Sequence, residues 1–488
     1  MNAIATPVGL AMTIRLRLPH TDKKERHKML DKELLQKILK KTLSSGGEYA
    51  DVFVERRKPT SIQLEDDKIE KIFSGIDSGV GIRLIHNSKT FYAFSNDLSE
   101  KALLEIADSL TKASKSPQKD ITLDLRKQRP EVNFNIKLIP ETVPMDKKIE
   151  LVRTANKTAR AFDKRIKQVI VMYRDSAQKV QIATSEGFIA EDERIHTLMV
   201  VHVIASDNGV IQTGYEPAGG LIGFELFENV KPEELALTAA KRATMMLTAR
   251  RAPGGRMPVV ISSNAGGTMI HEAIGHGLEA DLAQQGLSVY SGKIGETVAS
   301  PLITVLDDAT IPNKRGSFKF DDEGTPSQRT VLVKNGALTG YMYDNYTAMQ
   351  DKTRSTGNGR RESYHSRPIP RMTNTFIASG ESLPEDVLKS TPKGLFVKKM
   401  GGGQVNTVTG DFVFEVQEGY IIDNGRIGEP VRGATLTGNG PEVLKSIDRV
   451  GSDMGFSIGT CGKDNQGVPV SDAMPTIRIP EIVVGGEA

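Results

Sequence analysis

The sequence predicts an α+β protein of two domains, an N-terminal α+β domain over 29–250 and a β-rich domain over 251–488, after an extension at 1–28. Three observations predict this class. The chain has 488 residues, enough for two or three ordinary domains. Helical patterns alternate with strand-like runs in the first half. Beyond about residue 252, Gly and short β signals dominate and long helical patterns become rare.

Four helices are predicted in the N-terminal domain. The first begins near Asp31, because apolar residues recur at helical spacing from Leu30 to Leu39 and a Ser-Ser-Gly-Gly run follows at 44–47. The fourth begins at Pro232, with two glutamates in its first turn. The other two are expected near 100–112 and 147–162.

Strands are predicted where apolar and polar residues alternate between these helices. The runs lie at 50–57, 61–67, 79–86, 89–94, 168–175, 179–184 and 196–204. A Gly-rich loop is expected near 214–223. In the second half, Asn335-Gly336 and Asn424-Gly425 separate apolar runs, which indicates two tight hairpins, since both residue types tolerate positive φ.

Composition and charge describe a globular chain, 38% hydrophobic and 26% charged, with net charge +3. The extension at 1–28 shows no periodicity, and the first 41 residues are basic. Such a start can contact nucleic acid or an anionic surface, but we favour a solvated tail. No zinc-finger spacing, aromatic RNA-binding block or broad basic stripe accompanies it, so no nucleic-acid partner is expected. No run reaches the ~18–20 apolar residues of a bilayer span, so no membrane partner is expected either.

The single cysteine, Cys461, excludes an intrachain disulfide and favours a reducing compartment, so we expect a cytoplasmic protein. By itself, a free cysteine is most often a small buried apolar residue. That interpretation of Cys461 stays open at this point.

The residues that carry chemistry lie on one helix of the β-rich domain, which reads HEAIGHGLEAD over 271–281. His271, Glu272 and His276 resemble the HExxH zinc-peptidase motif, but the two histidines are five residues apart rather than four. In a regular α-helix, residues four apart lie about 40° apart around the axis and residues five apart about 140°. Both histidines can therefore reach one metal ion only if the helix takes in a π-bulge or breaks before His276. Gly275 and Gly277 make such a distortion inexpensive.

Other interpretations of this segment stay open. A lone histidine is more often a hydrogen-bonded structural residue than a metal ligand. The strand, Gly-rich loop and helix at 257–270 would also suit an anion bound at the helix N-terminus.

Three sequence blocks resemble the TldD members of the TldD/PmbA metallopeptidases. They are HEAIGHGLEAD at 271–281, TGNGRRESY at 356–364 with PRMTN at 370–374, and GTCGKDNQ at 459–466. The similarity runs from about residue 29 to the C-terminus. It implies a zinc peptidase with an HExxxH motif, in which His271, His276 and Cys461 bind one Zn²⁺ and Glu272 is the general base. PmbA-type partners share the fold but lack this motif, so its presence implies the catalytic type of chain.

The role of several neighbouring residues is left open. Glu279, Asp281 and His365 are competing third ligands, and Glu279 and Asp281 are alternatively carboxylates that orient the histidine rings. Arg360, Arg361, Tyr364 and His365 are either a solvated basic loop or groups that line the substrate cleft and hold a carboxylate or the oxyanion.

The resemblance further implies processing or degradation of unfolded and modified peptides by a dimer, either a heterodimer with a PmbA-type (TldE) subunit or a homodimer. A β-rich domain can bind an extended peptide at a sheet edge. Two other classes of function are weighed against this one: a non-catalytic regulatory or scaffold protein, and a metal hydrolase with a non-peptide substrate.

Overall fold

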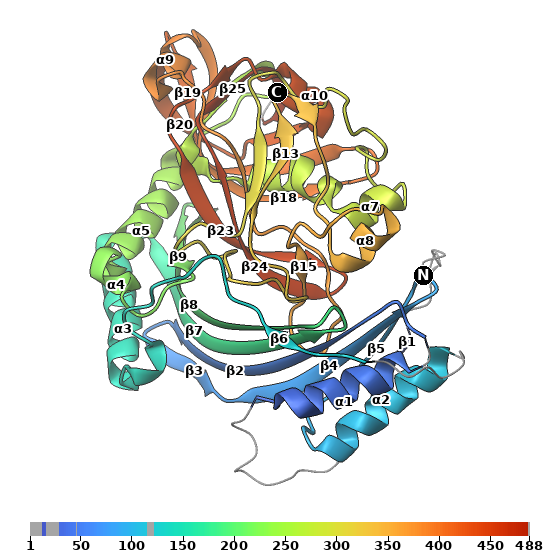
Figure 1. Cartoon of the computed structure of the whole chain (residues 1–488). Helices are drawn as coiled ribbons and strands as arrows, with labels where there is room; N and C mark the ends of the chain where they lie inside the picture. Colours follow the sequence, from blue (N-terminus) through green and yellow to red (C-terminus); the bar gives the residue numbers. More distant parts are fainter. Residues whose placement is uncertain (1–11, 16–28, 45, 115–121, 487–488) are drawn as a thin grey trace, which may run out of the picture.

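The computed structural model describes residues 12–15, 29–44, 46–114 and 122–486. A long curved sheet from the first half of the chain lies beneath a β-rich body from the second half (Figure 1). The first sheet holds the strands up to residue 220, and the other sheets hold only strands from residue 250 onward. The mixed α and β class is therefore confirmed, while the division into two domains at about 250 stays a prediction.

The N-terminal sheet has nine strands in the order β1-β5-β4-β2-β7-β8-β6, with β3 beside β2 and β9 beside β8. Its central strands are much longer than the sequence runs suggest, because neighbouring runs join into single strands. The bounds are β1 Met12–Arg15, β2 Tyr49–Glu65, β3 Lys68–Ser74, β4 Asp77–His86, β5 Lys89–Ser95, β6 Arg126–Lys127, β7 Ile166–Thr184, β8 Phe188–Asp207 and β9 Val210–Gly220.

The four predicted helices are present and cover the face of this sheet that points away from the β-rich body (Figure 1). Helix α1 (Lys32–Leu43) is capped by Asp31, whose side chain accepts the Leu34 N–H. It packs beside α2 (Glu100–Ser114), and α3 (Met145–Phe162) packs beside α5 (Pro232–Thr248). Short helical pieces precede α3 and α5, at Pro140–Thr142 and, as α4, at Leu226–Asn229.

The predicted Gly-rich loop near 214–223 is wrong, because most of it belongs to edge strand β9. Gly214 has a packing role there. A Cβ at this position would lie 1.9 Å from the Ala239 carbonyl oxygen of α5, so only glycine lets the helix lie this close to the strand. In the sequence, a glycine that permits close packing cannot be distinguished from a glycine of a loop.

The predicted loose extension is also structured in part. Residues Met12–Arg15 form β1, which pairs in parallel with Phe91–Phe94 of β5. A strand at the edge of a sheet has unpaired N–H and C=O groups, and β1 pairs with such groups of β5. The remainder of 1–28 lies outside the described residues.

The β-rich body contains three sheets. The eight-stranded sheet consists of β10 Arg250–Arg251, β11 Gly255–Ile261, β18 Lys393–Val405, β19 Asp411–Asp423, β20 Arg426–Arg432, β21 Thr435–Asn439, β22 Arg449–Val450 and β25 Ile477–Gly485. The six-stranded sheet consists of β12 Val305–Asp308, β13 Arg329–Lys334, β14 Ala337–Leu338, β17 Asn374–Ile377, β23 Gly455–Lys463 and β24 Gln466–Met474. Strands β15 Gly359–Arg360 and β16 Ile369–Pro370 pair with each other.

Both predicted hairpins are confirmed. Asn335-Gly336 joins β13 to β14 and Asn424-Gly425 joins β19 to β20, and all four residues have positive φ, as a type I′ turn requires. The short helices of this body are α6 Thr268–Ile270, α7 Ala280–Gln284, α8 Asn345–Gln350, α9 Pro384–Lys389 and α10 Gly440–Ser446, with 3₁₀ turns at Ser263–Ala265 and His276–Leu278 and a π turn at His271–Gly275.

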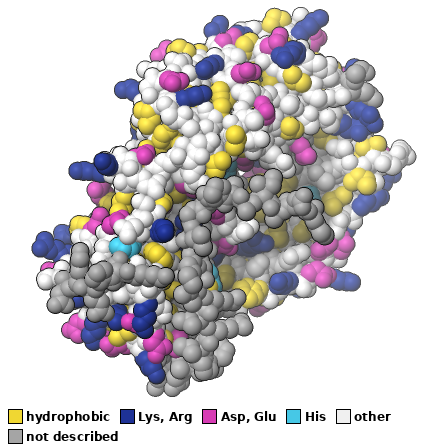
Figure 2. Space-filling model, turned by 90° about the vertical axis from the view of Figure 1, so that its right-hand side faces the viewer, with side chains coloured by type: hydrophobic (Ala, Val, Ile, Leu, Met, Phe, Trp, Pro, Cys, Tyr) yellow, Lys and Arg dark blue, Asp and Glu magenta, His cyan; other side chains and the backbone are white. Residues whose placement is uncertain are grey.

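Charges of both signs are interspersed on the surface seen in Figure 2. Within the part of the chain that the structure describes, no helix has the length and apolarity that crossing a bilayer requires.

Candidate metal centre

The helix that carries the HExxxH motif changes its hydrogen bonding twice in eleven residues. It starts as α6, continues as a π turn over His271–Gly275 and ends as a 3₁₀ turn over His276–Leu278. The His276 N–H donates to the His271 carbonyl, five residues back. The distortion predicted from the histidine spacing is confirmed.

The π turn brings the two histidine rings together. It takes in one extra residue, so residues five apart lie on the same side of the helix. The ring centroids of His271 and His276 are 5.0 Å apart, and the ring planes are nearly perpendicular, at 89°. Both side chains are largely buried.

The irregular turns leave carbonyl groups that neighbouring side chains satisfy. The Tyr290 hydroxyl donates to the Ala273 carbonyl at 3.0 Å, and the Ser288 hydroxyl donates to the Gly277 carbonyl at 2.6 Å. A Cβ at Gly277 would lie 2.7 Å from the Tyr290 ring. The distortion is therefore built into the packing around the helix.

Cys461, on β23, joins the two histidines. Its Sγ lies 3.5 Å from His276 Nε2, and one ligand atom from each of His271, His276 and Cys461 lies within 4.8 Å of the others. Among the described residues, this trio is the one cluster of His, Cys, Asp or Glu side chains whose ligand atoms lie close enough together to hold a metal ion.

The spacing of these atoms fits a zinc ion. With bonds of about 2.3 Å to sulfur and about 2.0–2.1 Å to nitrogen at tetrahedral angles, a thiolate and an imidazole on one zinc ion lie about 3.6 Å apart. The 3.5 Å between Cys461 Sγ and His276 Nε2 is close to that value. Two imidazoles and a thiolate are also donors that zinc accepts together, and a set of three leaves a fourth position open.

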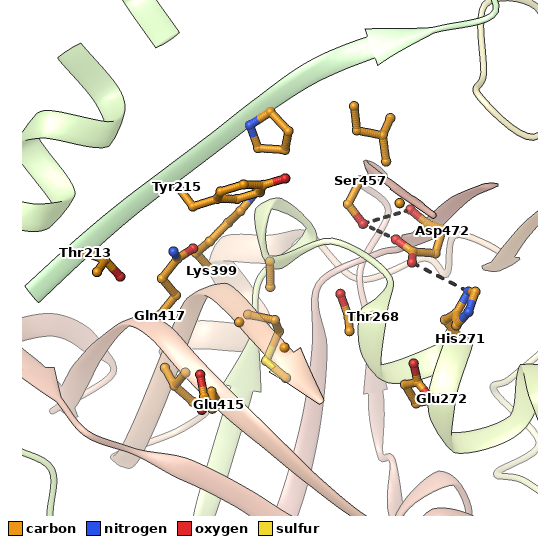
Figure 3. A pocket seen from close by; sticks show the side chains of 18 of the residues that line it. Thr213, Tyr215, Thr268, His271, Glu272, Lys399, Glu415, Gln417, Ser457 and Asp472 are labelled. Carbon is orange, nitrogen blue, oxygen red and sulfur yellow. Dashed lines mark hydrogen bonds and ion pairs between the residues drawn. The ribbon is translucent and has the colours of Figure 1, made fainter. Parts of the chain in front are cut away.

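A buried carboxylate faces the Nδ1 atom of each histidine. Glu279 Oε2 lies 3.0 Å from His276 Nδ1, and Asp472 Oδ2 lies 3.8 Å from His271 Nδ1. Asp472 is itself held by the Gly267 N–H at 3.2 Å and by the Ser457 hydroxyl (Figure 3). This arrangement leaves the Nε2 atoms for a metal ion, as carboxylate–histidine pairs do in known metal sites.

The Gly-Gly entry to the helix does hold an anion, as one of the open sequence interpretations suggested, and the anion is the chain's own Asp472. The Gly267 N–H at the start of α6 donates to this carboxylate. The helix start and the first histidine are thus fixed by one side chain.

Glu279 has no solvent exposure and lies among cations. Its Oε2 is 3.2 Å from Lys463 Nζ, and Lys463 also donates to Asp281 at 2.7 Å. Burial favours protonation of Glu279, but Lys463 and His276 lower its pKa to about 2. Burial raises the pKa of Asp281 to about 6. The carboxylate beside His276 is therefore ionised at neutral pH.

The Cys461 thiol is strongly acidic in this setting. Burial opposes its ionisation, but hydrogen bonds to His271 and His276 and their charges lower its pKa to about 5. Arg371, fully buried, donates to the Cys461 carbonyl at 2.5 Å and so fixes the backbone of this residue. A thiolate is the form in which cysteine binds metal.

Glu272 lines two hollows that meet at His271 and Cys461, and His276 lines the second of them. The first, about 500 Å³, extends to β9 and to the strands β18 and β19; the second, about 460 Å³, extends along β18 toward Thr407. Figure 3 shows His271, Glu272 and Asp472 on one side of the first hollow and Lys399, Glu415 and Gln417 on the other. Burial raises the pKa of Glu272, which suits a group that must take up and release a proton.

Other residues singled out from the sequence lie away from both hollows. Arg360 donates to the carbonyls of Met372 and Pro469, and Arg361 donates to Asp51 and to the Asp322 carbonyl. Both arginines are buried between the β-rich body and the N-terminal sheet rather than solvated.

Tyr364 and His365 lie in the same contact between the two bodies. The Tyr364 hydroxyl donates to Asp77, and the exposed His365 stacks on Tyr364 with ring centroids 4.0 Å apart. A role for Arg360, Arg361, Tyr364 and His365 in holding substrate stays a prediction, and their positions do not support it.

Asp472 and Lys463 were not predicted from the sequence. Lys463 lies in the same sequence block as Cys461, so the block contains this residue without indicating a role for it. Asp472 lies outside every motif. Its side chain reaches His271 because the start of α6 packs against β24, a contact that a single sequence does not reveal.

The comparisons with known proteins identify the family of this chain. Profiles of the PmbA/TldA metallopeptidases match residues 50–114 (domain 1), 139–247 (central domain) and 254–486 (C-terminal domain). A "Metalloprotease TldD homolog" of Haemophilus influenzae is 38% identical over 448 residues, which span 90% of this chain and 93% of that protein. A "Zinc metalloprotease TldD homolog" of Saccharolobus solfataricus is 25% identical over 92% of this chain and 99% of that protein.

Two solved structures share the fold. A Thermotoga maritima protein described as a putative modulator of a DNA gyrase superposes with a TM-score of 0.77 at 22% identity, over 93% of this chain and 99% of that one. TldE from Thermococcus kodakarensis superposes with a TM-score of 0.75 at 19% identity, over 93% of this chain and 100% of that one. With the three profiles and relatives above 30% identity across nine tenths of its length, this chain belongs to the PmbA/TldA metallopeptidase family.

Proposed function

We propose that this chain is a zinc-dependent peptidase that hydrolyses unfolded or modified peptides through its HExxxH motif. The observation that carries the proposal is the approach of His271, His276 and Cys461, whose ligand atoms lie within 4.8 Å of one another, with Glu272 beside them in the wall of a cleft. The family consists of metallopeptidases, and one relative is named as a zinc enzyme.

His271, His276 and Cys461 would hold the ion. Bound zinc supplies a Lewis acid that polarises the scissile carbonyl and lowers the pKa of water. Glu272 takes the proton of the attacking water and passes it to the departing amine. Glu279 and Asp472 lie beside the Nδ1 atoms of His276 and His271, which would leave the Nε2 atoms of both rings to bind the ion.

The walls of the cleft favour an extended peptide as substrate. Beyond Val397, β18 pairs only with β19 among the described strands, and β23 pairs only with β24. The free edges of both strands line the hollows beside Glu272, through residues 399–405 and 457–463. A peptide can add to such an edge by backbone hydrogen bonds, which a folded protein does not offer. Because hollows lie on both sides of Glu272, the substrate can continue in both directions from the cleaved bond.

For assembly, we propose a dimer, either with a TldE-type subunit or with a second copy of this chain. The match in fold to a TldE structure over 93% of this chain supports such a pairing, because subunits of one fold can form related interfaces. We place the protein in the cytoplasm, where a reducing environment keeps the Cys461 thiol able to bind metal.

One assay tests the function. The purified chain, alone and with a TldE-type subunit, is incubated with unstructured peptides and zinc, with a chelator as control, and its metal content is measured by elemental analysis. Peptide cleavage that the chelator stops and zinc restores is expected. Bound zinc without cleavage would favour a hydrolase with a non-peptide substrate, and no bound metal and no cleavage with either assembly would favour a scaffold protein.

A further inference from the structure

The contact between the N-terminal sheet and the β-rich body contains buried and half-buried arginines of two kinds. Those of the first kind have carboxylate partners. Arg83 pairs with Asp51 at 2.5 Å and with Glu323 at 2.6 Å, and Arg194 pairs with Asp322 at 2.7 Å. Pairing of this kind offsets the cost of removing a guanidinium from water.

Arginines of the second kind bond only to neutral acceptors. Arg57 Nε donates to the Ser176 hydroxyl at 3.1 Å, Arg360 to the Met372 and Pro469 carbonyls at 2.5 and 2.7 Å, and Arg315 Nε to the Gly459 carbonyl at 3.1 Å. Over the described ranges, no carboxylate forms an ion pair with any of these three. Three positive charges therefore meet in one contact without a counter-charge of their own.

A cavity of about 60 Å³ is lined by Arg57 and Arg360, and Arg315 lies outside its lining. Arg194 and Arg361 add two further cations, and Asp322 and Glu362 are the carboxylates of the lining. His196 also lines the cavity, and burial lowers its pKa well below the usual value, so it is neutral at pH 7. One water needs about 10–15 Å³ of such space, so the cavity has room for a few waters or one small ion, and not for a nucleotide or a peptide.

The acidic groups at the cavity are already engaged. Asp322 Oδ1 accepts from Arg194 and its Oδ2 accepts the Arg361 N–H at 2.8 Å. Glu55, which lies near Arg57, accepts from Gln178 and from the Tyr364 N–H. Glu362 accepts the Gly467 N–H and is exposed. Glu55 and Asp322 act on Arg57 and Arg360 from a distance, but among the described residues none of these carboxylates forms an ion pair with either arginine.

The electrostatics agree with this geometry. Burial, together with Arg194 and Arg371, lowers the pKa of Arg360 to about 10, although Asp322 opposes the shift. Burial, Arg57 and Arg174 lower the pKa of Arg315 to about 10. An anion in this contact would relieve the mutual repulsion of these groups.

We propose that this cavity is a binding site for a small tetrahedral oxyanion, phosphate or sulfate, held between Arg57 of β2 and Arg360 of β15. Guanidinium forks match such an anion in shape and charge. Because the two arginines come from opposite sides of the contact, the anion ties the sheet to the β-rich body. The site is separate from the cleft beside Glu272, since neither Arg57 nor Arg360 lines that cleft.

The test is a titration of the full-length, zinc-loaded protein with phosphate and, separately, with sulfate, at constant ionic strength maintained with NaCl. The midpoint of thermal unfolding is measured for the unaltered chain, for Arg57→Gln and for Arg56→Gln. Arg56 is the matched control, because it precedes Arg57 on β2, does not line the cavity, and carries the same charge.

For the unaltered chain and Arg56→Gln, a saturable rise in the midpoint with at least one of the two anions is expected. For Arg57→Gln, the apparent Kd should rise by about tenfold or more, because a charge-assisted hydrogen bond is lost. Arg57→Lys, which keeps the charge and loses the fork, should lie between the two. The anion whose response depends on Arg57 is the ligand.

Two results would overturn the proposal. One is the absence of any response beyond that of NaCl, and the other is an equal response in Arg57→Gln and Arg56→Gln. The titration is repeated with chelator present, because phosphate also binds metal ions; a response that then disappears belongs to the metal centre and counts against the proposal. Crystals grown with selenate in place of sulfate should show selenium in the cavity, and water alone there would contradict it.

Discussion

Two helical segments of this molecule differ in the regularity of their backbone, α5 and the segment 268–278. Helix α5 is regular over 17 residues, begins with proline and two glutamates, and presents alanines that let β9 approach closely. The segment 268–278 changes from α to π to 3₁₀ geometry, contains two glycines and carries the histidines. Both helices are packed against sheets, so burial does not explain the difference. The irregular helix is the one that must bring residues five apart to one point.

The difference also appears in what supports each helix. In α5 the backbone bonds are internal, and the contacts to the remainder of the chain come from packed apolar side chains and from Arg242, which pairs with Glu216 and Glu418. In the segment 268–278, Tyr290, Ser288 and Asp472 supply hydrogen bonds that a regular helix would not need. Support from distant parts of the chain is what keeps a strained segment in one geometry. Substitutions in the two helices should therefore have different consequences.

The largest contrast is expected for one carboxylate in each helix. Glu272→Gln removes the group that moves the proton and should lower the rate of peptide cleavage by about 10²–10⁴ while the zinc content stays unchanged. Glu234→Gln, in the first turn of α5, is the matched control and should leave the rate unchanged. The measurement is kcat on an unstructured peptide with elemental analysis of both variants; comparable turnover of Glu272→Gln would remove this residue from the mechanism.

The next effect concerns the ligand from outside the helix. Cys461→Ser should weaken zinc binding by more than about 100-fold, since loss even of a residue that only supports a ligand costs up to that much. His365→Ala, a competing third ligand by sequence that lies outside the trio, should leave the affinity unchanged. Competition with a chromogenic chelator measures both affinities. Unchanged zinc affinity in Cys461→Ser would point to another third ligand.

A smaller effect is expected for the carboxylate that holds the helix start. Asp472→Asn keeps the shape of the side chain but removes the charge beside His271, and should weaken zinc binding by about 10–100-fold. Thermal unfolding of the zinc-free variant checks that the fold persists. If zinc affinity does not change, the 3.8 Å approach of Asp472 to His271 Nδ1 has no role in orienting the ring.

The smallest effects are on stability and have opposite signs in the two helices. Gly277→Ala places a Cβ 2.7 Å from the buried Tyr290 ring and should destabilise the fold by about 1–3 kcal/mol. Thr238→Ala on the exposed side of α5 should stabilise it by about 0.5 kcal/mol through helix propensity. Denaturant unfolding of both variants measures the change. A neutral Gly277→Ala would show that the irregular helix can relax as freely as a regular one.

The sequence by itself determined the local parts of this protein. Helix starts such as Asp31 and Pro232, and the turns at Asn335-Gly336 and Asn424-Gly425, depend on neighbours in the chain and were predicted correctly. The distortion at His271–Leu278 was also predictable, since a spacing of five cannot share a face of a regular α-helix.

Only the tertiary structure decided what depends on distant residues. Cys461 lies 185 residues beyond His276, and Asp472 lies still further along the chain, so their approach to the histidines follows from the packing of β23 and β24 against the segment 263–270 and not from any local pattern. The glycine at 214 signals a loop in sequence and allows close packing in the fold. Arg360 and Arg361 read as a basic loop and are buried in the contact between the two bodies. Local propensity acts over a few residues, whereas burial and pairing depend on which strands the whole chain brings together.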